Sequence, residues 1–407
     1  SFDKSFSLSI QIDPPDQLYN PISDTVPVTF TTPVSDTAVN SLIFVHSERM
    51  DTYYTGADTY ATADLANKIN TLAAHPQVMG EVIDLADYDV FEDVYAVWDS
   101  QPENPLAANY VAQSIKSLIY ALAPAYPNLE YMVIVGEDRI IPQRRIQDDA
   151  LIANERTYAE VAYTPILSGS FSYRYFLTDD YYAGLTPFAF RNREFYLPQV
   201  GIGRLVEQPS EIAAVIDAFI AQPVLTPDDA LITGYDFLID QANEITETLN
   251  SYGVMNQTQL INNDWLASDF EQALFSRTEA QDLISLNSHF EHYRLFPNRG
   301  ADVFATQVVA GTDYSGKLIF SVGCHSGLNV TDAEARNALE ARDFAQAFSA
   351  QGATFLGNTG YGYGDTDLVA YSELLMVNFV DSLGDWSEGP QTVGRALQRA
   401  KQLFYNE

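Results

Sequence analysis

The sequence predicts an α/β protein with two consecutive doubly wound units, each built on a mostly parallel sheet, and a short N-terminal β-rich arm. Short apolar runs alternate with amphipathic stretches of helical length along most of the 407 residues, and strands that alternate with helices form parallel sheets covered on both faces. The alternation breaks at "QPVLTPDDA" (222–230), whose Pro and Asp content is typical of a linker. We therefore expect an arm at 1–40, a first unit at 41–225 and a second unit at 226–407.

The arm and the first unit follow from these patterns. "SFSLSIQI" and "VPVTFTTPV" alternate apolar and polar residues, which is typical of strands with one buried face. In the first unit we expect strands at 41–47, 80–88, 130–138 and 196–205, and helices at 57–75, 108–124 and 209–222. The remaining stretch, 144–196, is rich in tyrosine and shows no clear period.

The second unit repeats the alternation. We expect its buried strands at 230–236, 282–289, 317–324 and 353–359. Helices are expected between or after them, at 241–253, 343–352, 368–383 and 392–405. Crossover helices of this kind connect parallel strands, so the carboxyl ends of these strands should meet at one edge.

The excess of acidic residues excludes two classes of partner. Asp and Glu outnumber Lys and Arg by 55 to 21, which gives a formal net charge of −34. Such a surface repels nucleic acid and anionic membranes, and no apolar run approaches the ~20 residues that span a bilayer. The missing initiator Met and signal peptide favour a fragment of a larger precursor. The acidic surface without disulfides favours an extracellular or cell-surface protein of a bacterium or archaeon.

Three reactive side chains each end one of the expected strands of the second unit, namely Asp236, His289 and Cys324. Ligands of parallel α/β sheets bind at this edge. A thiolate is a nucleophile, an imidazole can take its proton and return it to a leaving amine, and a carboxylate can hold the ring in position. The sequence therefore predicts the catalytic set of a cysteine peptidase. The alternative is that Cys324, the only cysteine, is a small buried apolar residue.

Metal sites are the competing interpretation of the same region. A zinc ion could take four ligands from this region, His289, His292, Cys324 and His325. Thioester chemistry needs no cofactor, but a structural calcium ion is an option at the acidic loop that carries Asp365, Asp367 and Glu373. A solvated loop is the other interpretation of these three carboxylates.

Four other polar residues are interpreted as structural. His46 and His75 are expected in the core or on the surface of the first unit, away from any chemistry. Glu137 and Asp138 end a strand of the first unit, and we interpret them as structural carboxylates at the interface between the units.

Several stretches resemble the gingipain-type cysteine peptidases, which are relatives of the caspases. They are "YMVIVGEDRIIP", "TDDYYAG", "LPQVGIGRL" and "LITGYD", in the order found in that family, and His289 and Cys324 lie 35 residues apart, close to the family's spacing. The similarity extends over roughly residues 41–405. It implies two caspase-like subdomains, Cys324 as nucleophile, His289 as general acid and base, and Asp236 as the third catalytic residue.

The resemblance also implies how the substrate is held. The backbone N–H groups of Cys324 and Phe290 would form the oxyanion hole. Phe290 stands where the family usually has Gly, and Gly323 stands where it usually has Ala. At the substrate-binding site we expect Asp240, which would select a basic side chain, with Tyr361, Tyr363 and Asp180. The alternatives are that Asp240 only interacts with the N-terminus of its helix and that Asp180 belongs to an ordinary turn.

The function implied is that of a thiol endopeptidase that cleaves polypeptides after Arg or Lys. Two alternatives share these residues. Attack of an amine on the thioester would make the chain a transpeptidase that sorts surface proteins, and loss of catalytic geometry would leave a peptidase-like binding module of a surface protein.

Overall fold

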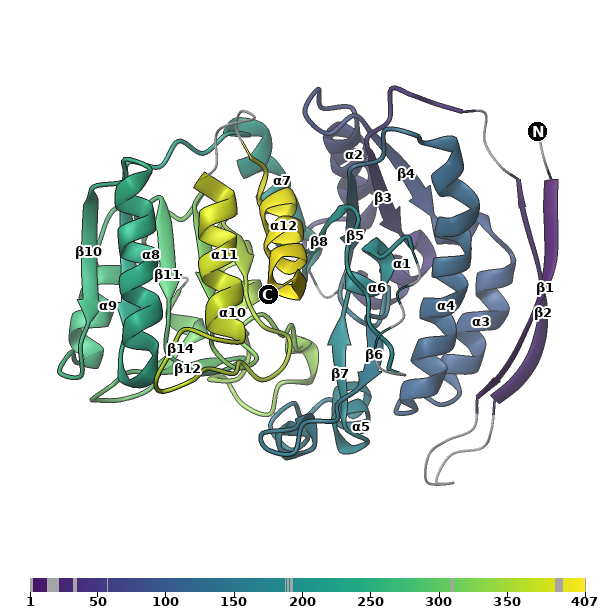
Figure 1. Cartoon of the computed structure of the whole chain (residues 1–407). Coiled ribbons are helices and arrows are strands. Elements are labelled where there is room, and N and C mark those ends of the chain that lie inside the picture. Colours follow the sequence, from purple (N-terminus) through teal and green to yellow (C-terminus); the bar gives the residue numbers. More distant parts are fainter. Residues whose placement is uncertain are drawn as a thin grey trace. The chain divides into compact units, whose positions relative to one another are not determined.

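The chain divides into two compact units (Figure 1). This computed structural model describes residues 3–12, 22–31, 35–56, 58–186, 188, 190, 193–308, 311–384 and 391–406. The first unit is Ser1–Gly56 with Thr62–Arg204, and the second is Ala57–Ala61 with Leu205–Glu407. The division therefore lies before helix α7 (Pro209–Ala221), about 20 residues ahead of the expected boundary at 225. The reason is that α7 packs against α10 (Phe344–Ser349) of the second unit.

The first unit contains a four-stranded sheet in the order β4-β3-β5-β8. Its central strand β3 pairs in parallel with β4 and β5, and all five residues of β3 are buried, as expected for a strand covered on both faces. The strands are β3 (Ser41–Val45), β4 (Gly80–Asp84), β5 (Tyr131–Val135) and β8 (Gly201–Leu205). The helices are α1 (Ser47–Tyr54), α2 (Thr62–Ala73), α3 (Val90–Asp99) and α4 (Pro105–Leu122).

The tyrosine-rich stretch contains more regular structure than its sequence indicates. Strands β6 (Arg144–Gln147) and β7 (Tyr175–Thr178) form an antiparallel pair, and helices α5 (Pro165–Ser172) and α6 (Asp180–Ala183) lie beside them in the sequence. At the N-terminus, β1 (Asp3–Ile12) pairs antiparallel with β2 (Ile22–Thr31). In the rest of the expected arm, residues 35–40 contain no helix or strand, and residues 1–2, 13–21 and 32–34 lie outside the described residues.

The second unit contains a five-stranded sheet in the order β10-β9-β11-β15-β16, and every pairing in it is parallel. The strands are β9 (Asp229–Gly234), β10 (Asn256–Ile261), β11 (Leu283–Leu286), β15 (Leu318–Ser321) and β16 (Thr354–Leu356). The expected α/β architecture with mostly parallel sheets is confirmed.

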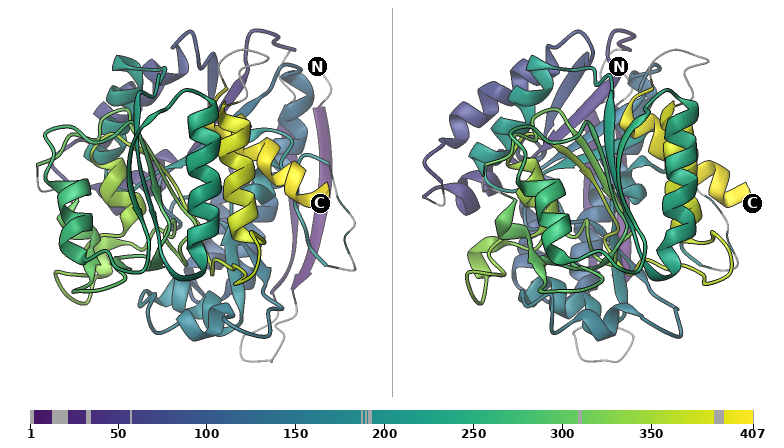
Figure 2. Two further views of the ribbon diagram at one scale, coloured as in Figure 1. Left: turned by 60° about the vertical axis from the view of Figure 1, so that its left-hand side comes forward. Right: turned by 90° about the vertical axis from the view of Figure 1, so that its left-hand side faces the viewer.

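Two hydrophobic cores lie on the two faces of this sheet, beneath the helices that Figure 2 shows on either side of it. Alternate strand residues explain the split, because Ile284 and Ile319 enter one core while Leu283 and Leu318 enter the other. The first core takes in α9 (Ala267–Phe275) and α10. The second takes in α8 (Ile239–Ser251), α11 (Ser372–Gly384) and α12 (Val393–Asn406). No helix in the described residues is long and apolar enough to cross a membrane.

A small antiparallel sheet follows β11 and was not expected from the sequence. It contains β12 (His289–Glu291), β13 (Arg294–Phe296) and β14 (Val303–Phe304) in that order. The expected strand 282–289 is therefore two strands. Asn287 makes the break, because its side chain donates to the Thr233 carbonyl at 2.9 Å and to Ser285 Oγ at 2.8 Å.

Candidate active site

Cys324 lies just beyond the end of β15. Ser321, the last residue of that strand, donates from Oγ to the Leu286 carbonyl at 2.8 Å and accepts from the Gly323 N–H at 3.0 Å. These two bonds fix the turn that leads to the thiol. Cys324 is partly exposed, and its Sγ lies 3.6 Å from the Gly362 carbonyl oxygen. The nucleophile predicted from the sequence is thus held at a defined strand end and is accessible.

His289 stands at the equivalent position beside it. Leu286 and Ser321 are paired across the parallel strands β11 and β15, and His289 and Cys324 each follow their partner by three residues. The spacing of 35 residues is therefore the register of the two strands. Equal offsets from paired strand ends bring the imidazole and the thiol to one edge of the sheet.

Aromatic rings surround the imidazole. The ring centroids of Tyr235 and Phe237 each lie 5.6 Å from that of His289, both in edge-to-face orientation. Burial lowers the pKa of His289, and the charge of Asp236 acts in the opposite direction. The imidazole is therefore neutral at pH 7, which is the state that can accept a proton from a thiol.

Asp236 acts on His289 by its charge. It lies beyond β9, in the 3₁₀ turn Asp236–Leu238, with a φ of 56° and an exposed side chain. Its N–H donates to Asn263 Oδ1 at 2.8 Å, which holds this turn. Within the described residues no hydrogen bond joins its carboxylate to the imidazole. The expected strand end at 236 is corrected to Gly234, and this turn carries the carboxylate.

Phe290 and Gly323 form a complementary pair beside these residues. The Phe290 side chain is 4% exposed, and its ring packs edge-to-face on Phe344 at 5.2 Å. A Cβ atom at position 323 would lie 2.7 Å from Cγ of the Phe290 ring, which is closer than such contacts occur. The two departures from the family pattern therefore depend on each other: the large ring at 290 requires glycine at 323.

The substrate-binding candidates occupy different places. Asp240 is half-buried in the first turn of α8, where its Oδ1 accepts from the Gln241 N–H at 2.8 Å. Tyr361 contacts His325 edge-to-face at 4.6 Å, and the exposed Tyr363 donates its N–H to Ser372 Oγ at 3.0 Å. These lie in the second unit.

Asp180 begins α6 in the first unit, and its N–H donates to Thr178 Oγ1. Its neighbour Asp179 accepts from the Arg204 guanidinium at 2.6 and 2.8 Å, so it is part of a structural ion pair within that unit.

The alternative metal sites are not assembled. No group of three or more His, Cys, Asp or Glu side chains in the described residues is arranged to hold a metal ion. His292 and His325 are fully buried, and burial holds the pKa of His292 well below its usual value. In the acidic loop, Asp365 Oδ1 accepts from the Asp367 N–H at 2.9 Å, and the Asp365 N–H donates to Glu373 Oε2 at 3.1 Å.

Glu373, considered above only as a calcium ligand, proves to be a buried carboxylate of the second unit. It is fully buried in the first turn of α11, and its Oε2 accepts from the N–H groups of Asp365 at 3.1 Å and Ala370 at 3.3 Å. Burial raises its pKa to about 7, and the charges of Asp240 and Asp365 act in the same direction. The sequence feature that could have indicated this buried carboxylate is a glutamate at the start of an apolar helical stretch, "SELLMVNFV".

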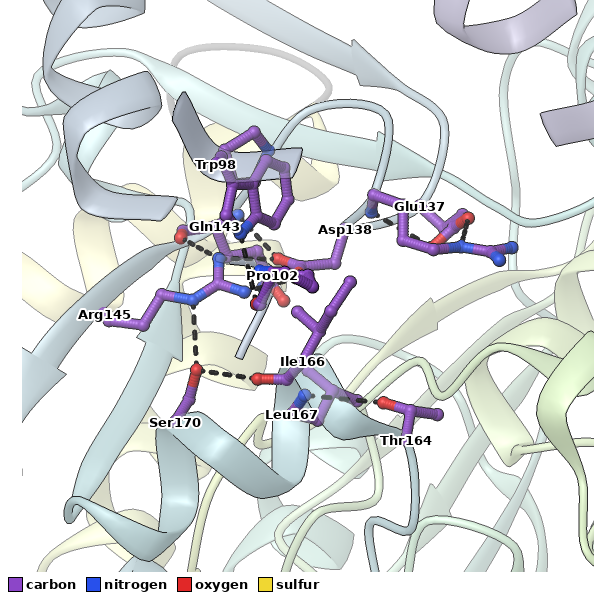
Figure 3. Close-up of polar contacts among 12 residues, drawn as sticks. Trp98, Pro102, Glu137, Asp138, Gln143, Arg145, Thr164, Ile166, Leu167 and Ser170 are labelled. Carbon is purple, nitrogen blue, oxygen red and sulfur yellow. Dashed lines mark hydrogen bonds and ion pairs between the residues drawn. The ribbon is translucent and has the colours of Figure 1, made fainter. Parts of the chain in front are cut away.

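The corresponding strand end of the first unit is a closed network (Figure 3). Arg145 is fully buried and donates from Nη1 to Asp138 Oδ1 at 2.9 Å and from Nε to Ser170 Oγ at 3.3 Å. Glu137 pairs with Arg139. Both carboxylates are held by ion pairs that lie within the first unit.

A cavity of about 530 Å³ lies elsewhere in the second unit, and its lining includes Asp58, Gln208, Glu211, Asp332 and Arg342. Neither Cys324 nor His289 lines it. The chemistry predicted from the sequence is therefore not located in this cavity.

Comparison with known proteins identifies the family. The model of peptidase family C25 matches residues 59–407. The crystal structure of the Arg-specific cysteine proteinase gingipain R superposes with a TM-score of 0.55 at 15% identity, covering 91% of this chain and 73% of that chain. A second solved structure, described as a protease, covers 90% of this chain and 76% of its own at 12% identity, with a TM-score of 0.48. No curated protein matches.

The likeness to gingipain R shows a shared fold, and the family model covers most of both units. The chain belongs to peptidase family C25, the gingipain family of cysteine peptidases.

Proposed function

We propose that this chain is an endopeptidase that cleaves after Arg or Lys through a thioester on Cys324, with His289 as general base and acid. The observation that supports this most is the register of β11 and β15, which gives the imidazole and the thiol equal offsets from paired strand ends. Cysteine peptidases require this pair at hydrogen-bond reach during turnover.

The proposed reaction has two halves. The imidazole of His289 takes the proton of the Cys324 thiol, and the thiolate attacks the carbonyl carbon of the scissile peptide. The N–H groups of Cys324 and Phe290 hold the oxyanion. Collapse of this intermediate breaks the C–N bond, and His289 gives its proton to the leaving amine. Water, deprotonated by His289, then attacks the thioester and releases the acid and the thiol.

The environment of His289 favours its proposed role in both halves of the reaction. Burial lowers its pKa, so the free enzyme presents a neutral base. The charge of Asp236 raises that pKa, which means that it stabilises the imidazolium formed in the intermediate. Asp236 thus helps the ring to carry the proton without a hydrogen bond to it.

The preference for a basic substrate rests on charge. The family resemblance aligns Asp240 within about two residues of the acidic residue that selects a basic P1 side chain, and Tyr361 and Tyr363 are proposed as the aromatic walls of that pocket. The net charge of −34 also favours basic peptides. Asp180 stays a prediction for substrate binding. We further infer action outside the cell, where an acidic chain without disulfides meets polypeptide substrates.

Fluorogenic peptides that differ only at P1 test this function. Wild type should hydrolyse the Arg and Lys peptides faster than the Leu and Asp peptides. Cys324→Ala should show no turnover, and His289→Ala should lose about 10²–10⁴-fold in kcat/KM. His75→Ala, in the first unit, is the control and should match wild type. Turnover by Cys324→Ala would overturn the mechanism.

A further inference from the structure

We infer that Ser326 is a positioning residue of the oxyanion hole, because its hydroxyl fixes the peptide unit that carries the Cys324 N–H. This inference rests on the proposed function, in which that N–H group holds the oxyanion. Ser326 follows the nucleophile by two residues, and it was not among the site residues predicted from the sequence.

The peptide unit between Val322 and Gly323 is held at both ends. Its carbonyl, on Val322, accepts from Asn358 Nδ2 at 2.7 Å, and its N–H, on Gly323, donates to Ser321 Oγ at 3.0 Å. Ser321 ends β15, and Asn358 lies just beyond β16, the strand that pairs with β15. The sheet therefore fixes the backbone as far as Gly323.

The next peptide unit, between Gly323 and Cys324, is held through its carbonyl. Ser326 Oγ donates to the Gly323 carbonyl at 2.9 Å, and the Ser326 N–H donates to the same oxygen at 3.3 Å. In a trans peptide the carbonyl and the N–H point in opposite directions. The bond from the hydroxyl therefore sets the direction of the Cys324 N–H, which points away from Ser326.

This restraint matters because residue 323 is glycine. A peptide unit changes its direction by rotation about the backbone bonds on either side of it, and glycine permits more of these rotations than any other residue. The Phe290 ring excludes a Cβ atom at position 323, so a larger residue cannot stiffen the backbone there. The hydrogen bond from Ser326 supplies the missing restraint.

The surroundings of Ser326 hold its hydroxyl in place. The side chain is fully buried, and a Cβ atom at Gly357 would lie 2.6 Å from Ser326 Oγ, so glycine at 357 leaves room for the hydroxyl. The following residue, Gly327, donates its N–H to the Asn358 carbonyl at 2.8 Å. The loop after β16 therefore packs against the residue that orients the oxyanion donor.

The test separates this role from a general effect on the thiol. Iodoacetamide alkylates a thiolate without forming an oxyanion, whereas a peptidyl aldehyde forms a hemithioacetal whose oxygen occupies the oxyanion hole. In Ser326→Ala the kcat for the best fluorogenic peptide should fall about 10-fold with KM nearly unchanged, and the aldehyde should bind about 10-fold more weakly. The rate of Cys324 alkylation and its dependence on pH should stay at the wild-type values.

Two further variants complete the test. Ser114→Ala, on α4 of the first unit, removes a buried hydroxyl that donates to the Tyr110 carbonyl at 3.0 Å. This matched control should keep the wild-type values in all three measurements. Ser326→Cys has nearly the volume of wild type but only a weak donor, so it should show the losses of Ser326→Ala without leaving a cavity. Peptide mapping distinguishes an adduct on Cys324 from one on residue 326.

The outcomes separate this inference from the proposed function. If wild type hydrolyses no peptide, the proposed function is wrong. If wild type is active and both variants at 326 keep its kcat and its affinity for the aldehyde, the proposed function stands and the role of Ser326 is wrong. Alkylation of Cys324 that slows as much as kcat would also contradict the inference, because the defect would then lie in the thiol.

Discussion

In the first unit Glu137 and Asp138 follow β5, and each pairs with an arginine of the same unit. In the second unit His289 and Cys324 follow β11 and β15, and nearby Glu373 is a buried carboxylate with one oxygen that accepts no hydrogen bond. Both sheets place polar residues at the carboxyl ends of their strands. In the first unit arginines neutralise the carboxylates there, whereas the second unit carries an imidazole and a thiol that can react. Paired charges mark a structural edge, and groups with perturbed pKa values mark a candidate site.

The largest effect expected from this comparison is on the stability of the first unit. Asp138→Asn leaves the fully buried Arg145 without its carboxylate, and a broken buried pair costs about 3–5 kcal/mol. Urea unfolding of the variant measures this loss in the free energy of unfolding. Arg193→Ala, which removes an exposed ion pair to Asp149, is the control and should cost less than about 1 kcal/mol. Equal losses would mean that the network is not structural.

At the edge of the second unit, removing the buried carboxylate of Glu373 should raise the free energy of unfolding, whereas Asp138→Asn lowers it. The pKa of Glu373 is raised from 4.5 to about 7, so the folded state binds more protons than the unfolded state between these values. Its contribution to stability therefore falls as pH rises from about 4.5 to 7.

Glu373→Gln abolishes this dependence and should be more stable than wild type at pH 8, by about 1–3 kcal/mol. Thermal or urea unfolding at pH 5 and pH 8 measures the difference. A variant that is less stable than wild type at pH 8 would show that this carboxylate is structural, like Asp138.

An effect of similar size is expected at the Phe290–Gly323 pair. Gly323→Ala forces a methyl group against the Phe290 ring, and overpacking costs about 1–3 kcal/mol. In a Phe290→Leu background the same substitution should cost less, because the smaller side chain leaves room. A double-mutant cycle on unfolding free energies measures this coupling. Additive losses would contradict the complementarity of the two residues.

The smallest effect is expected from Asp236, whose side chain is exposed and acts only through its charge. Asp236→Asn should lower the pKa of His289 further, because the carboxylate raises it. The chain has five histidines, so NMR titration of their ring protons can follow His289. The loss in kcat should be about 2- to 10-fold. A pKa that does not move would remove Asp236 from the site.

The parts that could be predicted from the sequence are those with a repeated local pattern. Buried strands such as β3 and β15 are apolar runs, and the offset between His289 and Cys324 is a property of strand register. Other features leave no such pattern. Strands β12 to β14 have two or three residues each, too few for a period to show.

Packing between distant parts of the chain explains the other features that were not predicted from the sequence. Nothing local in the sequence shows that the Phe290 ring lies on Gly323 or that α11 buries Glu373. Asp236 was expected at a strand end because the apolar run continues to Tyr235, whereas the pairing ends at Gly234. Burial and pairing depend on elements that are distant in the sequence, so these residues needed the structure.

The most direct test of the account is covalent labelling of Cys324 by a peptidyl acyloxymethyl ketone with arginine at P1, followed by intact mass and peptide mapping. The account predicts one adduct per chain, on Cys324, none in Cys324→Ala, and labelling slowed by at least about 100-fold in His289→Ala. Cleavage of the matching peptide while Cys324 stays unmodified, or labelling of His289→Ala at the wild-type rate, would contradict it.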